Sequence, residues 1–130
     1  MTTPFWCLLI VAVIPYVLAG AAGYFKTQQF GKPDNNEPRA QAAQLEGAGA
    51  RAVAAQSNAW EALALFTPSV IIAHLAGADP GMSATASLIF VAARVVHPVL
   101  YIAGQATLRS LVFMVGFGCA IWLFSLAASA

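Results

Sequence analysis

The chain has 130 residues, of which 60% are hydrophobic and only 8% are charged, and its formal net charge is +1. Soluble domains carry roughly 25% charged residues, so this composition excludes an ordinary water-soluble domain and indicates an integral membrane protein. The small net charge gives no support for a nucleic-acid partner. Cys7 and Cys119 lie in apolar runs, where we expect buried unpaired thiols rather than a disulfide or a metal site.

Four apolar runs are each close to the roughly 20 residues that cross a bilayer as a helix. They are predicted at about residues 4–25, 50–76, 82–106 and 108–128. No Lys or Arg stands ahead of Phe5, which argues for a membrane helix rather than a signal peptide at the start. We therefore predict an all-α fold, a four-helix transmembrane bundle that forms one domain over residues 1–130.

A polar segment at about 26–49 joins the first two runs and holds more than half of the charged side chains. Lys32 to Asn36 has the composition of a turn, and Pro38 is predicted to begin a helix that runs on toward Arg51. Residues 77–81, between the second and third runs, also read as a tight turn.

The basic residues outside the middle of the helices are distributed unevenly between the two sides of the predicted bundle. The side of the first and third loops carries Lys26, Lys32, Arg39, Arg51 and Arg109. The opposite side carries no Lys or Arg. The positive-inside rule therefore predicts that the first and third loops are cytoplasmic and that both termini lie on the other side of the membrane.

Three polar residues mark the beginning of the second helix. Arg51, Asn58 and Glu61 follow at intervals of seven and three, which places them within about 80° of one another on a helix. A charged residue at the centre of a membrane helix costs about 2.5–3.5 kcal/mol on insertion scales, so such residues are functional candidates by default.

A second polar stripe lies on the third helix, where Arg94, His97, Tyr101 and Gln105 are spaced by three, four and four residues. Such a stripe is often only a structural contact between helices. Here, however, the second and third helices form an antiparallel hairpin, which places this stripe at the depth of the first one. We expect a polar cluster in the cytoplasmic half of the bilayer.

Within this cluster, Arg94 and Glu61 are predicted to form a neutral pair, and Arg109 opens the fourth helix on the same side. Arginines offer bidentate donors to carboxylates, while glutamate and asparagine accept from an ammonium or amide. His97 and Tyr101 add donors for a carbonyl or a thiolate. A small zwitterion with several carboxylates fits, and glutathione has this charge pattern, although residue types alone do not single it out. An apolar co-substrate can arrive laterally from the lipid.

The motifs resemble those of the MAPEG family, the membrane-associated proteins of eicosanoid and glutathione metabolism. The resemblance covers the whole chain and rests on its size, four spans and polar first loop. It also rests on the NxxE pattern of Asn58 and Glu61, on RxxHxxxY from Arg94 to Tyr101, and on the arginine that opens the fourth span.

The resemblance implies a homotrimer that binds glutathione between neighbouring subunits, facing the cytoplasm. The residues that it assigns to this pocket are Asn58, Glu61, Arg94, His97 and Tyr101. Arg109 resembles the family arginine that stabilises the glutathione thiolate, and with Tyr101 it forms the expected catalytic pair. The best-known members carry an arginine where this chain has Ala54, so Arg51 is expected at the rim of the pocket, one turn further out.

The predicted function is that of a glutathione-dependent membrane transferase or peroxidase acting on lipophilic electrophiles or hydroperoxides. The alternative is a non-catalytic lipid-binding or scaffold protein of the same fold. A transporter or channel is disfavoured because the polar residues stop at mid-membrane, and beyond Arg109 the fourth helix offers only Ser110 and Ser125 as polar side chains.

Overall fold

The computed structural model describes residues 1–130 as five α-helices without β-strands. They are α1 (Thr3–Phe30), α2 (Pro38–Ala43), α3 (Gly47–Ala76), α4 (Pro80–Ile102) and α5 (Ala106–Ala128). Four of them, α1, α3, α4 and α5, are long and apolar enough to cross a membrane. The predicted all-α bundle with four membrane-spanning helices is thus confirmed, and the chain fits an integral multi-pass membrane protein.

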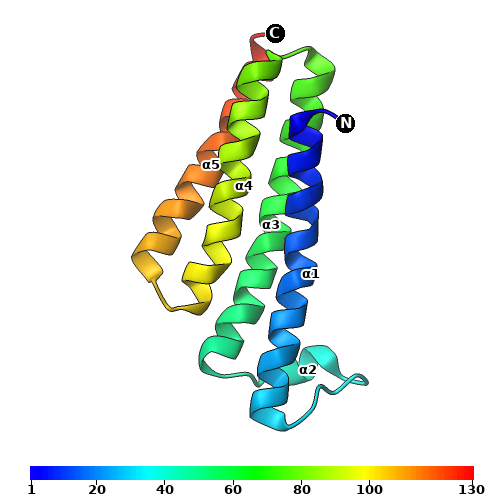
Figure 1. Ribbon diagram of the computed structural model, residues 1–130, viewed down its shortest axis with the longest axis vertical. Helices are drawn as coiled ribbons and strands as arrows, with labels where there is room; N and C mark the ends of the chain where they lie inside the picture. Colours follow the sequence, from blue (N-terminus) through cyan, green and yellow to red (C-terminus); the bar gives the residue numbers. More distant parts are fainter.

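The four long helices run side by side along the length of the molecule (Figure 1). The first loop with α2 lies at the lower end, as does the α4–α5 connection, whereas the α3–α4 turn and both termini lie toward the upper end. We refer to the half of the bundle next to the first loop as the loop half. The half next to the α3–α4 turn is the turn half.

The approach to α3 differs from the prediction, because no continuous helix runs from Pro38 toward Arg51. The short helix α2 ends at Ala43, and α3 begins anew at Gly47, which has a φ of 55° that helices do not accommodate. The bend lets Leu45 turn inward, where it is 6% exposed. The interruption therefore accompanies the burial of this leucine.

The end of α4 also differs from the prediction of a helix over 82–106. Gly104 has a φ of 78°, and its N–H donates to the carbonyl of Tyr101, while the N–H of Gln105 donates to that of Leu100 at 2.9 Å. This is the Schellman pattern, in which a left-handed glycine ends a helix and satisfies its last carbonyls. Gln105 therefore leaves the polar stripe of the third membrane helix and precedes α5.

The α3–α4 hairpin is fixed by a short turn of the predicted kind. Gly77 is left-handed with a φ of 76°, and the N–H of Ala78 donates to the carbonyl of Ala73. On the other side of the turn, the carboxylate of Asp79 accepts from the N–H of Met82 at 2.7 Å and caps α4. Because this turn is so short, it determines which residues of α3 and α4 lie at the same depth in the bundle.

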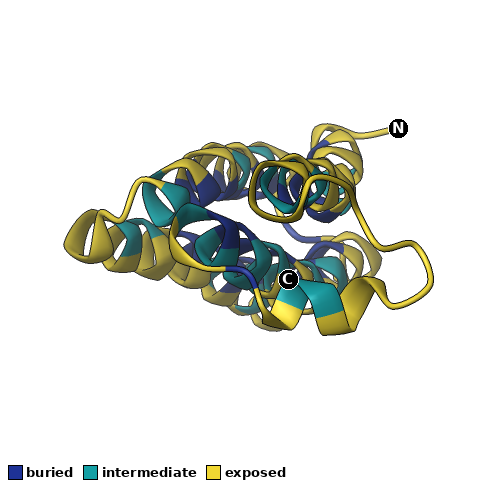
Figure 2. Ribbon diagram, turned by 90° about the horizontal axis from the view of Figure 1, so that it is seen from below, coloured by how far each residue is buried: buried dark blue, intermediate teal, exposed yellow.

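The core lies along the inward faces of the helices, as the view along the bundle shows (Figure 2). Small residues let α3 approach its neighbours closely, since Ala52, Ala55 and Ala59 are at most 3% exposed. At mid-bundle, the rings of Phe66 and Phe90 are stacked with centroids 3.9 Å apart. The two cysteines are buried and unpaired, in agreement with the prediction.

Candidate functional site

The predicted cluster in the loop half is assembled around the amide of Asn58. Arg94 on α4 donates from Nη2 to Oδ1 of Asn58 at 2.8 Å, and Nδ2 of Asn58 donates to Oε2 of Glu61 at 3.4 Å. Arg94 is only 3% exposed. The antiparallel hairpin therefore brings the two polar stripes together, as the sequence predicted.

The direct ion pair predicted between Arg94 and Glu61 does not form, since no nitrogen–oxygen pair of these side chains lies within 4.0 Å. Asn58 is one turn from Glu61 on the same helix, and an amide both accepts and donates. It therefore takes the position between guanidinium and carboxylate and contacts both. This arrangement leaves Glu61 exposed on the single chain, with carboxylate oxygens available to a further donor.

A second set of contacts joins α4 to the start of α5. The ring of His97 is buried and meets the ring of Tyr101 edge to face, with centroids 5.8 Å apart. The guanidinium carbon of Arg109 lies 4.2 Å from the centroid of the Tyr101 ring, a cation–π contact. Nδ1 of His97 is buried without a hydrogen-bond partner. The side chain of Arg109 on α5 therefore lies over the polar stripe of α4, although the chain between Tyr101 and Arg109 is not one continuous helix and breaks at Gly104.

Arg51 lies at the rim of the cluster. Its Nε donates to the carbonyl of Ile102 at 3.0 Å, at the C-terminal end of α4. Cations interact favourably with the unpaired carbonyls at a helix C-terminus, which accounts for this position. The structure does not bring Arg51 into hydrogen bonding with Asn58 or Glu61.

Sequence reasoning missed the contribution of α5 beyond Arg109. A cleft of about 180 Å³ lies beside Glu61 and Arg94, and Phe90, Phe113 and Phe117 give it aromatic walls. A signal was present, because Phe113 and Phe117 follow Arg109 at intervals of four and therefore share its helix face.

The glycine of α5 that lines this cleft lets the helix lie close to the buried arginine. A Cβ at Gly116 would lie 3.7 Å from Cδ of Arg94, so the aliphatic part of the arginine packs directly on the backbone of α5. The arginine therefore buries its stem against α5 while its guanidinium reaches Asn58 on α3. The site thus consists of a cationic cluster with an adjoining apolar cleft.

The cluster is chemically suited to a small anionic or zwitterionic ligand. It holds three arginines, Arg51, Arg94 and Arg109, but a single carboxylate, that of Glu61. No group of three or more His, Cys, Asp or Glu side chains is placed to hold a metal ion.

The fold and this site define a multi-pass helical membrane protein with a cluster of polar side chains inside one half of its bundle. Residues 3–129 match the model of the MAPEG family, and the chain belongs to that family. The resemblance found in the sequence motifs is therefore confirmed over nearly the full chain. Membership places the protein among membrane proteins of the glutathione-related transferase and peroxidase type. No curated protein matches the chain closely enough to count as a relative.

Proposed function

We propose that the protein is a glutathione-dependent membrane transferase or peroxidase that acts on lipophilic electrophiles or hydroperoxides. The observation that carries this proposal is the hydrogen-bonded series of Arg94, Asn58 and Glu61 inside a membrane-spanning hairpin. A structural ion pair would need only two of these groups. Here three groups are joined through an amide, and Arg94 and Glu61 keep further donors and acceptors for a ligand, which favours a recognition site.

The charges of the cluster complement those of glutathione, which has two carboxylates and one ammonium group. The guanidinium of Arg94 has five N–H donors, of which the bond to Asn58 uses one, so others remain for a ligand carboxylate. Glu61 is the acceptor for the ammonium group, and Asn58 and His97 offer partners for the amides. Arg51 at the rim adds positive charge that attracts the second carboxylate.

Arg109 and Tyr101 are the proposed catalytic residues. A cation beside a thiol favours the thiolate, which is the reactive nucleophile. The thiolate attacks the electrophilic carbon of a lipophilic substrate, so that a carbon–sulfur bond forms and the leaving group departs or a proton is taken up. With a hydroperoxide, sulfur takes the terminal oxygen and releases an alcohol, and a second glutathione then yields the disulfide and water. The Tyr101 ring holds Arg109 in place by its cation–π contact.

The apolar cleft beside Arg94 and Glu61 supports the lipophilic half of this proposal. Its aromatic side chains Phe113 and Phe117 are exposed on the outside of the single chain, so the cleft offers apolar surface to a lipophilic substrate. A thiol bound by the cationic cluster would then meet its partner at the boundary between polar and apolar surface.

We further propose a homotrimer with glutathione bound between subunits on the cytoplasmic side. The support for an assembly is the exposure of Glu61 on a membrane-spanning helix, since a charged group facing lipid is costly and a neighbouring subunit would cover it. The support for the orientation is the excess of Lys and Arg at the end of the first and third loops. Both termini then lie on the opposite side.

Thermal stability of the detergent-purified protein tests the binding proposal. A ligand at 100 times its dissociation constant stabilises a protein by about 2.7 kcal/mol, so millimolar glutathione should raise the melting temperature clearly. Glu61→Ala should lose most of this rise. Glu46→Ala, which removes an exposed carboxylate ahead of α3, is the matched control and should retain it. The absence of any shift in the unaltered protein would refute the proposal.

An experiment on Arg109 distinguishes the proposed enzyme from the alternative, a non-catalytic lipid-binding or scaffold protein of the same fold. If the protein is an enzyme, bound glutathione shows thiolate absorption in the ultraviolet, and Arg109→Ala abolishes it while binding persists. If glutathione binds but Arg109→Ala leaves thiolate formation unchanged, the catalytic assignment is wrong.

A further inference from the structure

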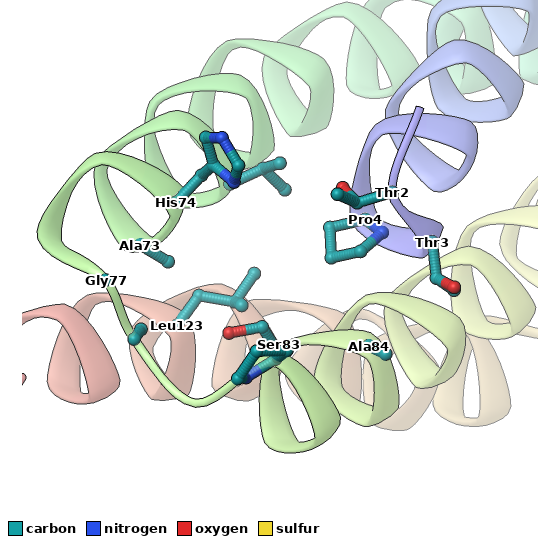
Figure 3. A pocket seen from close by; sticks show the side chains of 12 residues that line it. Thr2, Thr3, Pro4, Ala73, His74, Gly77, Ser83, Ala84 and Leu123 are labelled. Atoms are coloured by element: carbon teal, nitrogen blue, oxygen red, sulfur yellow. The ribbon is translucent and has the colours of Figure 1, made fainter.

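The turn half contains a cavity that the proposed glutathione site does not use. It has a volume of about 460 Å³ and lies between the start of α1, the end of α3 and the start of α4. Figure 3 shows Pro4 and Thr2 on one side of this space, His74 on another, and Ser83 and Ala84 on the α4 side. The volume falls within the roughly 300–1,000 Å³ typical of small-molecule sites.

One lining residue has a buried polar group without a hydrogen-bond partner. Ser83 is 7% exposed, and its buried hydroxyl has no hydrogen-bond partner. The hydroxyls of Thr67, Ser69 and Thr85 each donate to a carbonyl of the preceding turn, whereas those of Ser83 and Ser87 are buried without a partner, and of these two only Ser83 lines the cavity. A buried hydroxyl without a partner is unfavourable, so a hydrogen-bonding group inside the cavity would stabilise the hydroxyl of Ser83.

The remaining lining sets the character of that partner. The walls are mainly small or apolar side chains, including Val70, Ala73 and Leu123, and no Lys or Arg is among them. Asp79 lies nearby, but its carboxylate already caps α4 through the N–H of Met82. The lining itself therefore offers an anionic ligand no Lys or Arg and a cationic ligand no carboxylate.

His74 completes the site at its outer side. Its ring meets that of Phe5 edge to face at 4.9 Å, which positions the imidazole at the cavity while its nitrogens make no hydrogen bond within the chain. The cavity thus combines an apolar interior with four hydrogen-bonding side chains that have no partner in the chain, those of Ser83, His74, Thr2 and Thr3, at one end of the four membrane-spanning helices.

We propose that this cavity binds a neutral, lipid-soluble molecule that carries a hydroxyl group, with the hydroxyl bonded to Ser83 and the apolar body against Val70 and Leu123. A hydroxyl both donates and accepts, so it satisfies Ser83 whichever way that hydroxyl turns. This ligand is distinct from glutathione and from its co-substrate, because the cavity and the Arg94 cluster share no lining residue.

Photolabelling tests the proposal with a defined probe, a long-chain alcohol that carries a diazirine group. The full chain is placed in phosphatidylcholine nanodiscs and labelled at increasing probe concentrations, and the labelled peptides are identified by mass spectrometry. Labelling of the segments around Pro4 and Ala84 should be saturable. Unlabelled dodecanol should compete for it, whereas dodecanoate, which has a negative charge, should compete less.

Two variants and a matched control locate the interaction. Ser83→Ala should weaken competition by dodecanol roughly threefold to tenfold, as expected for one hydrogen bond, without lowering the melting temperature. Ser87→Ala is the matched control, because Ser87 is also buried and unpaired on α4 but does not line the cavity, so competition should be unchanged. Ala84→Phe should fill the space and abolish saturable labelling.

Labelling that never saturates, or that spreads evenly over the lipid-facing helices, would overturn the proposal and leave the cavity as a water-filled crevice. Equal effects of Ser83→Ala and Ser87→Ala would overturn the assignment of Ser83. Both results are independent of whether glutathione binds in the loop half.

Discussion

In the loop half of the bundle, Arg94, Asn58 and Glu61 form a hydrogen-bonded series, whereas in the turn half the buried hydroxyl of Ser83 faces a cavity without a partner. Arg94 bonds to Asn58, Asn58 to Glu61, and Arg109 lies over Tyr101. The first arrangement is a preorganised set of charges that stays in place without a ligand. The second is a cavity lined by a buried hydroxyl that has no hydrogen-bond partner. The two halves therefore suit ligands of opposite character, a charged water-soluble molecule and a neutral membrane-soluble one.

The stacked rings of Phe66 and Phe90 lie between these two sites. Both side chains are at most 1% exposed, and Phe90 forms part of the wall of the cleft beside Arg94. Toward the turn half, Val70 follows Phe66 one turn further along α3 and lines the turn-half cavity. The aromatic layer accounts for the absence of a shared lining residue and predicts that each site can be altered without the other.

Arg94→Leu is the variant with the largest expected effect on this comparison. Truncating one partner of a buried charged hydrogen bond costs about 2–5 kcal/mol, so glutathione affinity should fall at least about 30-fold. Isothermal titration of the nanodisc-embedded protein measures it. Arg39→Leu, which removes an exposed cation of the first loop, is the control and should bind normally. Alcohol labelling in the turn half should also be unchanged, and its loss would show that the two sites are not independent.

Phe66→Ala has the next largest expected effect, because it removes one ring of the stacked pair that lies between the two sites. In soluble proteins, loss of a buried phenylalanine costs about 3–5 kcal/mol, but lipid replaces water in the membrane reference state, so we expect about 2–3 kcal/mol here. Unfolding by titration with a denaturing detergent measures this loss. The void should weaken binding at both sites together.

Phe30→Ala is the control for this variant, because Phe30 lies at the solvated end of α1 and is 37% exposed. It should change stability by less than about 0.5 kcal/mol. A Phe66→Ala protein as stable as the unaltered one would contradict the role given to the stack.

The sequence alone predicted most of the loop half, because two helical periodicities and one tight turn determine it. Once Gly77 to Pro80 are recognised as a turn, the depth of every residue on α3 and α4 follows to within about a turn, and Asn58 must lie near Arg94. The partner of each group was harder to predict. Side-chain lengths and rotamers decide that Asn58 rather than Glu61 contacts Arg94, and residue spacing does not contain that information.

The sequence pattern did not predict the break at Gly104 or the turn-half cavity, for two different reasons. The break at Gly104 had a local signal, a glycine near the end of an apolar run, but the run reads as continuous helix if hydrophobicity alone is followed. The turn-half cavity had no signal at all. It depends on the space left between three helices, and the hydroxyls of Ser83 and Thr85 look alike in sequence although only that of Thr85 has a partner.

The smallest expected effect concerns Tyr101 and distinguishes its ring from its hydroxyl. Tyr101→Phe keeps the aromatic face under Arg109, so thiolate absorption and kcat should stay within about twofold of normal, while the loss of a ligand hydrogen bond weakens glutathione binding a few-fold. Tyr101→Leu removes the cation–π contact, which is worth about 1 kcal/mol, and kcat should fall about fivefold. Stopped-flow absorbance with saturating glutathione separates the two effects. If Tyr101→Phe lowers kcat as much as Tyr101→Leu does, the hydroxyl rather than the ring acts on the thiolate, and Arg109 is held in place by something other than the aromatic face.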